Sequence, residues 1–354
     1  MNGAPEANST ADLGFWFRVL LLAVCIIVAT LLLWQLIHLL LLVFGAVLVA
    51  VLLRAFADLI ERYTPLQEKS ALAAAVVVIV VLIAGFTYIL GAQIQQQLLQ
   101  LVSQLPDFLQ SMEKQLGVSN IEEWLAARIE KAFDSASIVA NVAGYSSAAA
   151  GIAANTLLVL VGGVYIAVHP RLYRKGFLIL LPREARSEAA ETITLIGEAL
   201  KLWLLGQLLA MAFVGALIAL GLTILGVSSA LALGLIAGLL EFVPYVGPVL
   251  SAVPGIATAF AQSPVTALWV AGLYLVVQQL EGILITPLIQ QRTVDLPPAL
   301  TLFAIVAFGM LLGPLGVLFA TPLTVVCFVL VKKLWIRETL EEETTIPGET
   351  EPTE

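Results

Sequence analysis

Two glutamates are the residues of this chain most suited to chemistry. Of its 25 acidic residues, only Glu241 and Glu281 lie within apolar runs, and each shortly precedes a proline, Pro244 or Pro287. A carboxylate at membrane depth costs roughly 2.5–3.5 kcal/mol on insertion scales, so it is expected to face protein or water and to hold a proton or a cation. The pair therefore predicts a coupling site for protons or sodium ions. The alternative is that both side chains lie near helix ends and reach water there.

Two glutamines precede the second carboxylate. Gln278 lies three positions before Glu281, which places both on one face of a helix, and Gln279 follows Gln278 directly. Their amide groups predict hydrogen bonds to a small polar solute. Glutamines also hold membrane helices together, and the sequence leaves both roles open.

Two proline-broken segments must position these groups. Residues 229–262 and 299–331 are apolar but interrupted by proline, so each half is too short to cross about 30 Å of hydrocarbon at 1.5 Å per residue. Both segments are predicted to be helical hairpins with non-helical tips. The predicted tip residues are Pro244, Tyr245, Gly247 and Pro248 in the first hairpin, and Gly313, Pro314, Gly316 and Pro322 in the second.

The hairpin tips are predicted to form a transport site. Irregular backbone at membrane depth is tolerated where it is buried in protein or lines a wet cavity, and broken helices direct their dipole ends at solutes or ions. The first hairpin is expected to open from the outer face and the second from the inner face. The alternative is that the prolines only kink packed helices.

The composition places the chain in a membrane. Of its 354 residues, 60% are hydrophobic and 12% are charged, with a mean hydropathy of +1.01, whereas soluble domains are about 45–50% apolar and 25% charged. Runs such as 19–53 and 71–90 lack the alternation of barrel strands. The predicted fold class is all-α, a polytopic helical membrane protein with two broken hairpins and an amphipathic helical outer segment.

Changes in polarity along the chain predict its divisions. The run 19–53 exceeds one span of about 20 residues, and Gln35–His38 is its most polar point, so a hairpin turn is predicted there. The predicted parts are a cytoplasmic tail (1–18), three transmembrane helices (19–91), an outer amphipathic segment (92–150), a transmembrane helix (151–168), a basic cytoplasmic connector (169–201), a transport core (202–333) and an acidic disordered tail (334–354).

The basic residues predict the orientation. With the amino terminus inside, only Lys114, Arg128 and Lys131 of the 17 lysines and arginines lie on the outer side. Lysine and arginine concentrate in cytoplasmic loops, and this rule applies only weakly to a long outer segment such as the one that contains these three residues, where six acids outnumber them. The sequence therefore predicts a multi-pass protein of the bacterial inner membrane with both termini in the cytoplasm.

Other chemistries find no support. Cys25 and Cys327 lie in apolar runs, and His38 and His169 are far apart in the chain. No nucleophile motif, phosphate-binding loop or metal-ligand spacing is present. A net charge of −8 without a basic patch argues against a nucleic-acid partner. We therefore expect neither an enzyme nor a bound cofactor or metal.

The sequence of the first hairpin tip resembles a known family. Residues 241–248 read Glu-Phe-Val-Pro-Tyr-Val-Gly-Pro, which is similar to the Pro-Tyr-hydrophobic-Gly-Pro turn of the autoinducer-2 exporter family of bacterial permease-like proteins. The resemblance covers residues 11–333. Further matching features, in order, are Gly206-Gln207, Gln279-Leu280-Glu281 leading to Pro287, and Gly313-Pro314-Leu315-Gly316 followed by Pro322.

The resemblance implies an oligomeric inner-membrane carrier that exports the quorum-sensing furanone, or that exchanges sodium for protons as other members do. Family members usually have Asn where this chain has Gly282, and often His-Pro where it has Pro297-Pro298. These departures concern the substrate and leave the expected fold unchanged.

The leading hypothesis is a secondary transporter that moves a small polar solute by alternating access, coupled to protons or sodium through Glu241 and Glu281. Membrane lipid and further copies of the chain, in a homo-oligomer, are its other expected partners. A sodium/proton antiporter and a passive channel along an oligomer axis are alternatives. A third is a non-transporting scaffold that binds partners through residues 92–148.

Overall fold

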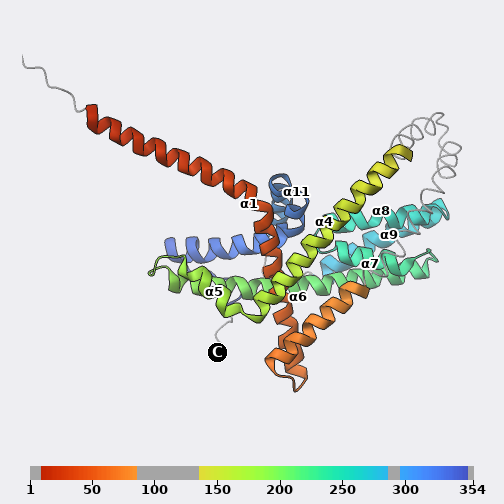
Figure 1. Cartoon of the computed structure of the whole chain (residues 1–354). Helices are drawn as coiled ribbons and strands as arrows, with labels where there is room; N and C mark the ends of the chain where they lie inside the picture. Colours follow the sequence, from red (N-terminus) through yellow and green to blue (C-terminus); the bar gives the residue numbers. More distant parts are fainter. Residues whose placement is uncertain (1–8, 86–134, 286–295, 350–354) are drawn as a thin grey trace, which may run out of the picture.

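The computed structural model describes residues 9–85, 135–285 and 296–349. This part of the chain is helical and contains no strand, which confirms the all-α prediction. Five of its helices are long and apolar enough to cross a membrane, or six if one sharply bent pair counts as a span. Figure 1 shows the helices crossing one another at steep angles around the middle of α6 (Arg186–Ile224).

The amino-terminal run forms one helix where a hairpin was predicted. Helix α1 extends over Ser9–Tyr63 without a break, so Gln35 and His38 are helical. The predicted turn is wrong because this step contains no glycine, proline, asparagine or aspartate to end a helix. In Figure 1 the first part of α1 projects from the body and the second part runs through it. A separate helix, Glu68–Gly85, follows.

Helix α4 covers Ser135–Val168 and therefore begins earlier than the predicted boundary at residue 151. Its first half is rich in alanine, a strong helix former, which explains the extension. The rest of the predicted outer segment, residues 92–134, lies outside the described residues. Helix α5 (Pro170–Ile179) follows after one residue and makes an angle of 91° with the end of α4.

The first predicted hairpin is confirmed. Helix α7 covers Ala230–Leu240 and α8 covers Val246–Phe260, with the tip between them. With 11 and 15 residues, the helices are about 16 and 22 Å long, shorter than the roughly 30 Å hydrocarbon core. Helix α9 (Pro264–Leu280) then returns alongside α8 and continues as a π-helical turn, η1 (Glu281–Ile285).

The second hairpin turns at Gly313. Helix α11 (Pro298–Leu330) is interrupted there by a residue with φ of 69° and ψ of −153°. A Cβ on Gly316 would lie 2.0 Å from the carbonyl oxygen of Phe308, although residues eight apart in a straight helix are about 12 Å apart. The chain therefore reverses sharply at this point. Pro322, predicted at the tip, instead lies buried within the returning helix.

Two hydrophobic cores share α6. The first, here called the scaffold core, joins Leu200 and Trp203 of α6 to α1 and to the returning half of α11. The second, the hairpin core, joins Val214 and Ile218 of α6 to α7, α8 and α9. A smaller cluster packs α1, the helix Glu68–Gly85 and α4 together. The two main cores thus meet end to end along a single helix.

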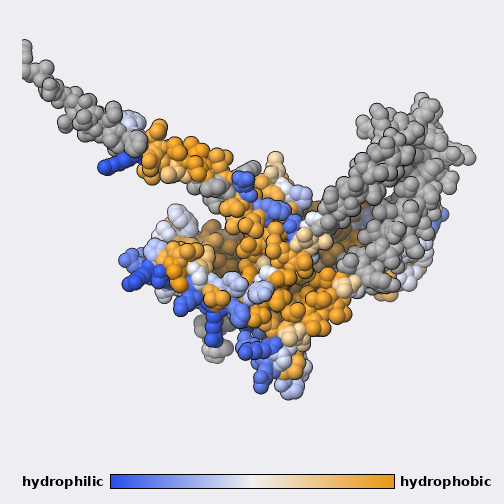
Figure 2. Space-filling view, viewed as in Figure 1, coloured by the Kyte–Doolittle hydropathy of each residue, from blue (hydrophilic) through white to orange (hydrophobic). Residues whose placement is uncertain are grey.

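Ion pairs tie the scaffold helices together at their polar ends. Lys201 of α6 lies 2.6 Å from Asp58 of α1. Arg54 lies 2.8 Å from Glu68 and also donates hydrogen bonds to the carbonyl oxygen of Ala167 at the end of α4. In Figure 2 the visible surface is mostly hydrophobic, and hydrophilic residues gather over the loop after α1 and over the segment between α5 and α6.

The carboxyl-terminal segment folds back onto α6. The sequence predicts disorder from residue 334, but the π-helix η2 covers Val331–Thr339 and the chain is described to Glu349. Ile346 is only 3% exposed and joins the scaffold core, and a Cβ on Gly348 would lie 2.8 Å from the carbonyl oxygen of Leu195. One buried apolar residue among acids was too weak a signal to predict this docking from the sequence.

Candidate transport site

Glu241 is buried at the tip of the first hairpin. It caps the carboxyl end of α7 and is 3% exposed. Its Oε2 atom has no hydrogen-bond partner among the described residues. A buried carboxylate oxygen without a partner is costly to maintain, so its retention suggests a role other than packing. Such an oxygen can accept a proton or coordinate a cation.

Gln207 of α6 fixes the position of this carboxylate. Its side-chain Nε2 donates a 2.6 Å hydrogen bond to the main-chain oxygen of Glu241. That carbonyl belongs to the end of α7, where the last carbonyls of a helix lack partners within the helix. One turn earlier on α6, Trp203 packs edge-on against Phe242 with ring centroids 5.8 Å apart. Two side chains of α6 thus hold the tip.

The second carboxylate is brought to the same place. Glu281 begins the π-helical turn η1, which packs against α6, and its Oε2 accepts a 3.0 Å hydrogen bond from Gln278. Its charge lies close enough to act on both Glu241 and Tyr245. Single π-helical turns are frequent at functional sites because they redirect side chains. The fold therefore brings Glu241 and Glu281 near one another, although they are forty positions apart in the sequence.

The tip owes its shape to two residues of the Pro-Tyr-Val-Gly-Pro sequence. Tyr245 precedes α8 with a positive φ of 64°, which is uncommon for a side-chain-bearing residue. A Cβ on Gly247 would lie 1.9 Å from the carbonyl oxygen of Leu240, so only glycine allows the two helices to approach this closely. Pro248 falls in the first turn of α8, where its missing N–H does no harm.

Tyr274 is a positioning residue that the sequence analysis missed. Its hydroxyl donates a 3.0 Å hydrogen bond to the main-chain oxygen of Ser251 and links α9 to α8. Tyr274 precedes Gln278 by four positions and Glu281 by seven, so all three lie on one face of α9. Extending the helical spacing one turn back from the glutamine would have found it.

Other predicted residues are placed apart from the carboxylates. Gln279 is exposed on α9, and Pro287 lies outside the described residues. Gly313, Pro314 and Gly316 form the second tip. The two tips pack against the same scaffold core, through Phe242 on one side and through Leu312 and Leu315 on the other.

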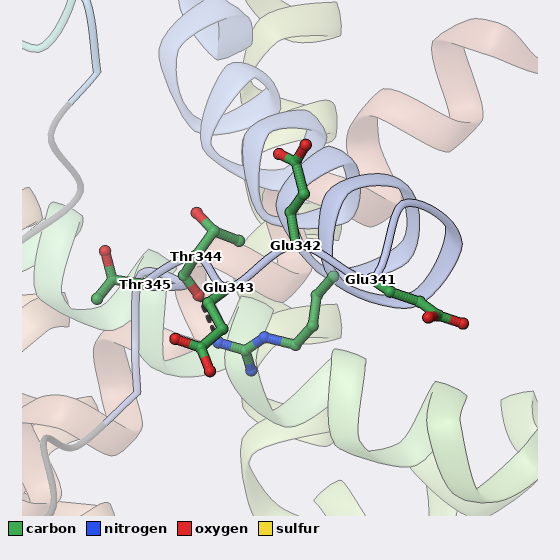
Figure 3. Close-up of a pocket in the computed structure, with 6 residues that line it drawn as sticks. Glu341, Glu342, Glu343, Thr344 and Thr345 are labelled. Carbon is green, nitrogen blue, oxygen red and sulfur yellow. Dashed lines mark hydrogen bonds between the residues drawn. The ribbon is translucent and has the colours of Figure 1, made fainter.

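A cavity elsewhere in the molecule contains none of the predicted site residues. Figure 3 shows it beside the carboxyl-terminal segment, where Arg337 hydrogen-bonds the main-chain oxygen of Thr344. Its acidic lining residues are Glu341, Glu342 and Glu343. The candidate transport site is therefore the pair of carboxylates, Glu241 at the first tip and Glu281 at the start of η1.

Comparison with known proteins identifies related chains. Residues 20–335 match the family described as AI-2E family transporter. "Putative transport protein YueF" of Bacillus subtilis is 29% identical over 261 residues, covering 68% of this chain and 70% of that protein. "Putative transport protein YhhT" of Escherichia coli K12 is 26% identical, covering 77% of each chain. "AI-2 transport protein TqsA" of Escherichia coli K12 is 34% identical over 106 residues, covering 30% of this chain and 31% of that protein.

Proposed function

We propose that this chain, which belongs to the AI-2E transporter family, is a secondary transporter that moves a small polar solute, coupled to protons or sodium through Glu241 and Glu281. The observation that carries this proposal is the buried carboxylate oxygen of Glu241, which has no hydrogen-bond partner in the described part of the chain and lies within reach of the charge on Glu281. Two like charges near one another, one of them buried, favour uptake of a shared proton or a cation. The coupling ion would therefore bind directly to these carboxylates.

The broken hairpins supply the moving parts of this mechanism. Both tips pack on the scaffold core, and each contains a residue in the left-handed region, Tyr245 or Gly313. In this mechanism small rotations of each hairpin open the site to one side at a time. Neutralising the pair with a cation favours closure, because it removes the repulsion between the carboxylates.

The cytoplasmic side is proposed to be the polar end of the scaffold. The ion pairs of Arg54 with Glu68 and of Lys201 with Asp58, and the bond from Arg54 to α4, place basic residues of α1 and α6 at that end. Basic loops favour the cytoplasm. We propose that both termini lie in the cytoplasm of a bacterial inner membrane, which requires the projecting first part of α1 to cross the bilayer separately from the second part.

The solute is proposed to be a small polar molecule of the kind named for one relative, an AI-2 transport protein. Gln278 already donates to Glu281, and its remaining N–H and its carbonyl are suited to hydroxyl groups on such a molecule. Export is the proposed direction.

Transport by the purified protein in liposomes tests the proposal. We would impose a sodium gradient or a pH gradient and follow proton movement with an enclosed pH dye and efflux of radiolabelled AI-2. The wild type would be compared with Glu281→Gln and with Glu61→Gln, an exposed acid on α1 that serves as the matched control. We expect gradient-driven flux that is lost in Glu281→Gln alone.

Other outcomes would contradict parts of the proposal. Flux that neither saturates nor responds to either gradient would indicate a passive channel. Proton movement without AI-2 efflux would indicate a sodium/proton antiporter. No flux under any condition would favour a scaffold role. Equal gradient-driven flux in Glu281→Gln and wild type would remove Glu281 from the coupling site.

A further inference from the structure

Helix α5 has an unusual arrangement of side chains for a connector between membrane helices. Arg171, Arg174 and Lys175 are spaced three and four apart, so they share one face. The opposite face is apolar. Its exposed side chains, with their exposed fractions, are Leu172 (66%), Tyr173 (46%), Phe177 (54%), Ile179 (56%) and, directly after the helix, Leu180 (81%). No residue of α5 is buried.

The direction of α5 is set by its neighbours. It meets the end of α4 at 91°, so if α4 crosses the bilayer, α5 lies along the membrane plane. Arg174 donates a 2.7 Å hydrogen bond to the main-chain oxygen of Ala190 on α6. Arg186 donates a 3.1 Å bond to the main-chain oxygen of Ile179. Both ends of the helix are therefore fixed.

Charge argues against α5 as the second half of a membrane span. Residues 170–186 contain five basic residues and one acid, Glu184. Three of the basic residues lie within five positions of α5, and each would be costly to place in hydrocarbon. The same charges are favourable at the cytoplasmic surface of a bilayer, where anionic headgroups attract them.

We propose that α5 is an interfacial helix that inserts its Leu172–Phe177–Leu180 face between lipids and binds anionic headgroups through Arg171 and Lys175. An amphipathic helix with basic residues on one face and aromatic or leucine residues on the other lies at this depth, with its apolar face about 5–10 Å into the boundary between headgroups and chains. The bilayer thereby holds the junction between α4 and α6 at a fixed height.

Fluorescence quenching in the full-length protein tests this. Cys25 and Cys327 would be replaced by serine, and a bimane label would be placed by Phe177→Cys, by Leu180→Cys, or by Glu184→Cys as the exposed control. The proteins would be reconstituted into vesicles containing equal amounts of phosphatidylcholine and phosphatidylglycerol. Lipids brominated on the acyl chain and aqueous iodide would serve as quenchers.

We expect brominated lipid to quench the labels at 177 and 180 and iodide to quench the label at 184. Iodide quenching at 177 equal to that at 184, without quenching by lipid, would overturn insertion. Protection from both quenchers would also overturn it, because protein, such as a second copy, would then cover the face. A single elution peak and unchanged helical content would show that each variant is folded.

The headgroup part of the proposal has its own test. Arg171→Gln with Lys175→Gln removes two charges and retains Arg174, which holds α6. We expect this variant to lose most of the lipid quenching at 177 in the anionic vesicles. The control is Arg62→Gln with Lys69→Gln, two exposed basic residues at the end of α1 and the start of the next helix, which should leave quenching unchanged. Equal quenching in the double variant and wild type, or in vesicles with and without phosphatidylglycerol, would overturn headgroup recognition.

Discussion

The scaffold core and the hairpin core differ in whether the buried charges near them have partners of opposite charge. Around the scaffold core, Lys333 is only 4% exposed, yet it lies 3.0 Å from Glu191 and 2.9 Å from Glu338. At the edge of the hairpin core, Glu241 is equally buried, but one of its oxygens has no hydrogen-bond partner among residues 9–85, 135–285 and 296–349, and its electrostatic neighbour is another acid. The scaffold uses charge to join helices, whereas the hairpin region keeps charge available for a ligand.

The backbone shows the same contrast. Helices of the scaffold are long and continuous, as in α1 and α6. The hairpin region consists of α7 and α8, with 11 and 15 residues, joined by a tip that contains a residue of positive φ. Long helices linked by ion pairs resist relative motion, and short helices joined by strained tips permit it. Together these differences predict a static body and a moving body.

The largest effect is expected from a methyl group at the first tip. In Gly247→Ala the new Cβ would lie 1.9 Å from the carbonyl oxygen of Leu240, a main-chain atom that cannot rotate away. We expect a loss of about 3 kcal/mol in the free energy of unfolding and loss of flux. Thermal unfolding in detergent would measure it. The control is Gly272→Ala on α9, where an added Cβ meets no atom within 4 Å; equal behaviour of the two variants would contradict the tip geometry.

The next largest effect concerns the scaffold. Lys333→Met keeps most of the buried side chain but removes the charge shared by Glu191 and Glu338. Because both acids are partly exposed, they can return to water, and we expect a loss of about 1–2 kcal/mol with the transport mechanism retained. Lys69→Met, at an exposed position, is the control. Unchanged stability would contradict a stabilising role for the ion pairs of Lys333. A loss of ion coupling would contradict the conclusion that they act only on stability.

An effect of opposite sign is expected at the hairpin site. Glu241→Gln removes a charge from a buried oxygen for which the described residues supply no hydrogen-bond partner. We expect the free energy of unfolding to rise by about 1 kcal/mol while gradient-driven flux is lost. Parallel unfolding and liposome measurements on one preparation would decide this. A fall in stability of similar size would mean that Glu241 is structural, and the comparison between the two cores would fail.

The smallest effect is expected at the carboxyl-terminal segment. The hydrogen bonds from Arg337 lower the pKa of Glu349. The contribution of this pair is therefore fully present above the ordinary carboxyl pKa of about 4.3 and is lost as pH falls through the lower value in the folded protein. At neutral pH we expect Glu349→Gln to be less stable than wild type by about 0.2–1 kcal/mol. The difference should vanish in acid; a difference that persists there would contradict the assignment.

The sequence predicted the parts of the fold that depend on composition and on strong breakers. Apolar runs predicted the membrane helices, and Pro244 and Gly313 correctly predicted two reversals of the chain. Polarity alone was a poor guide. The Gln35–His38 step was read as a turn, but polar residues without a breaker continue a helix. Proline alone was also insufficient, because Pro322 lies within a helix.

The sequence predicted which residues belong to the candidate site, but it did not predict the contacts between them. Glu241 and Glu281 could be selected from the sequence because placing a carboxylate in hydrocarbon is energetically costly, so carboxylates in apolar runs are rare in any fold. The hydrogen bond from Gln207 to the carbonyl of Glu241 and that from Tyr274 to Ser251 depend on which helices pack together. Long-range packing determines which helices meet, and a single sequence does not show which helices pack together.

The short first hairpin has a consequence for biogenesis. Neither α7 nor α8 is long enough to be recognised as a membrane segment by itself, since insertion favours stretches of about 20 apolar residues. We therefore expect the two halves to partition from the translocon as one unit, joined by the tight turn that Gly247 permits. The hairpin then adds no net crossing, and segments synthesised later keep their sidedness whether or not it has settled to its final depth.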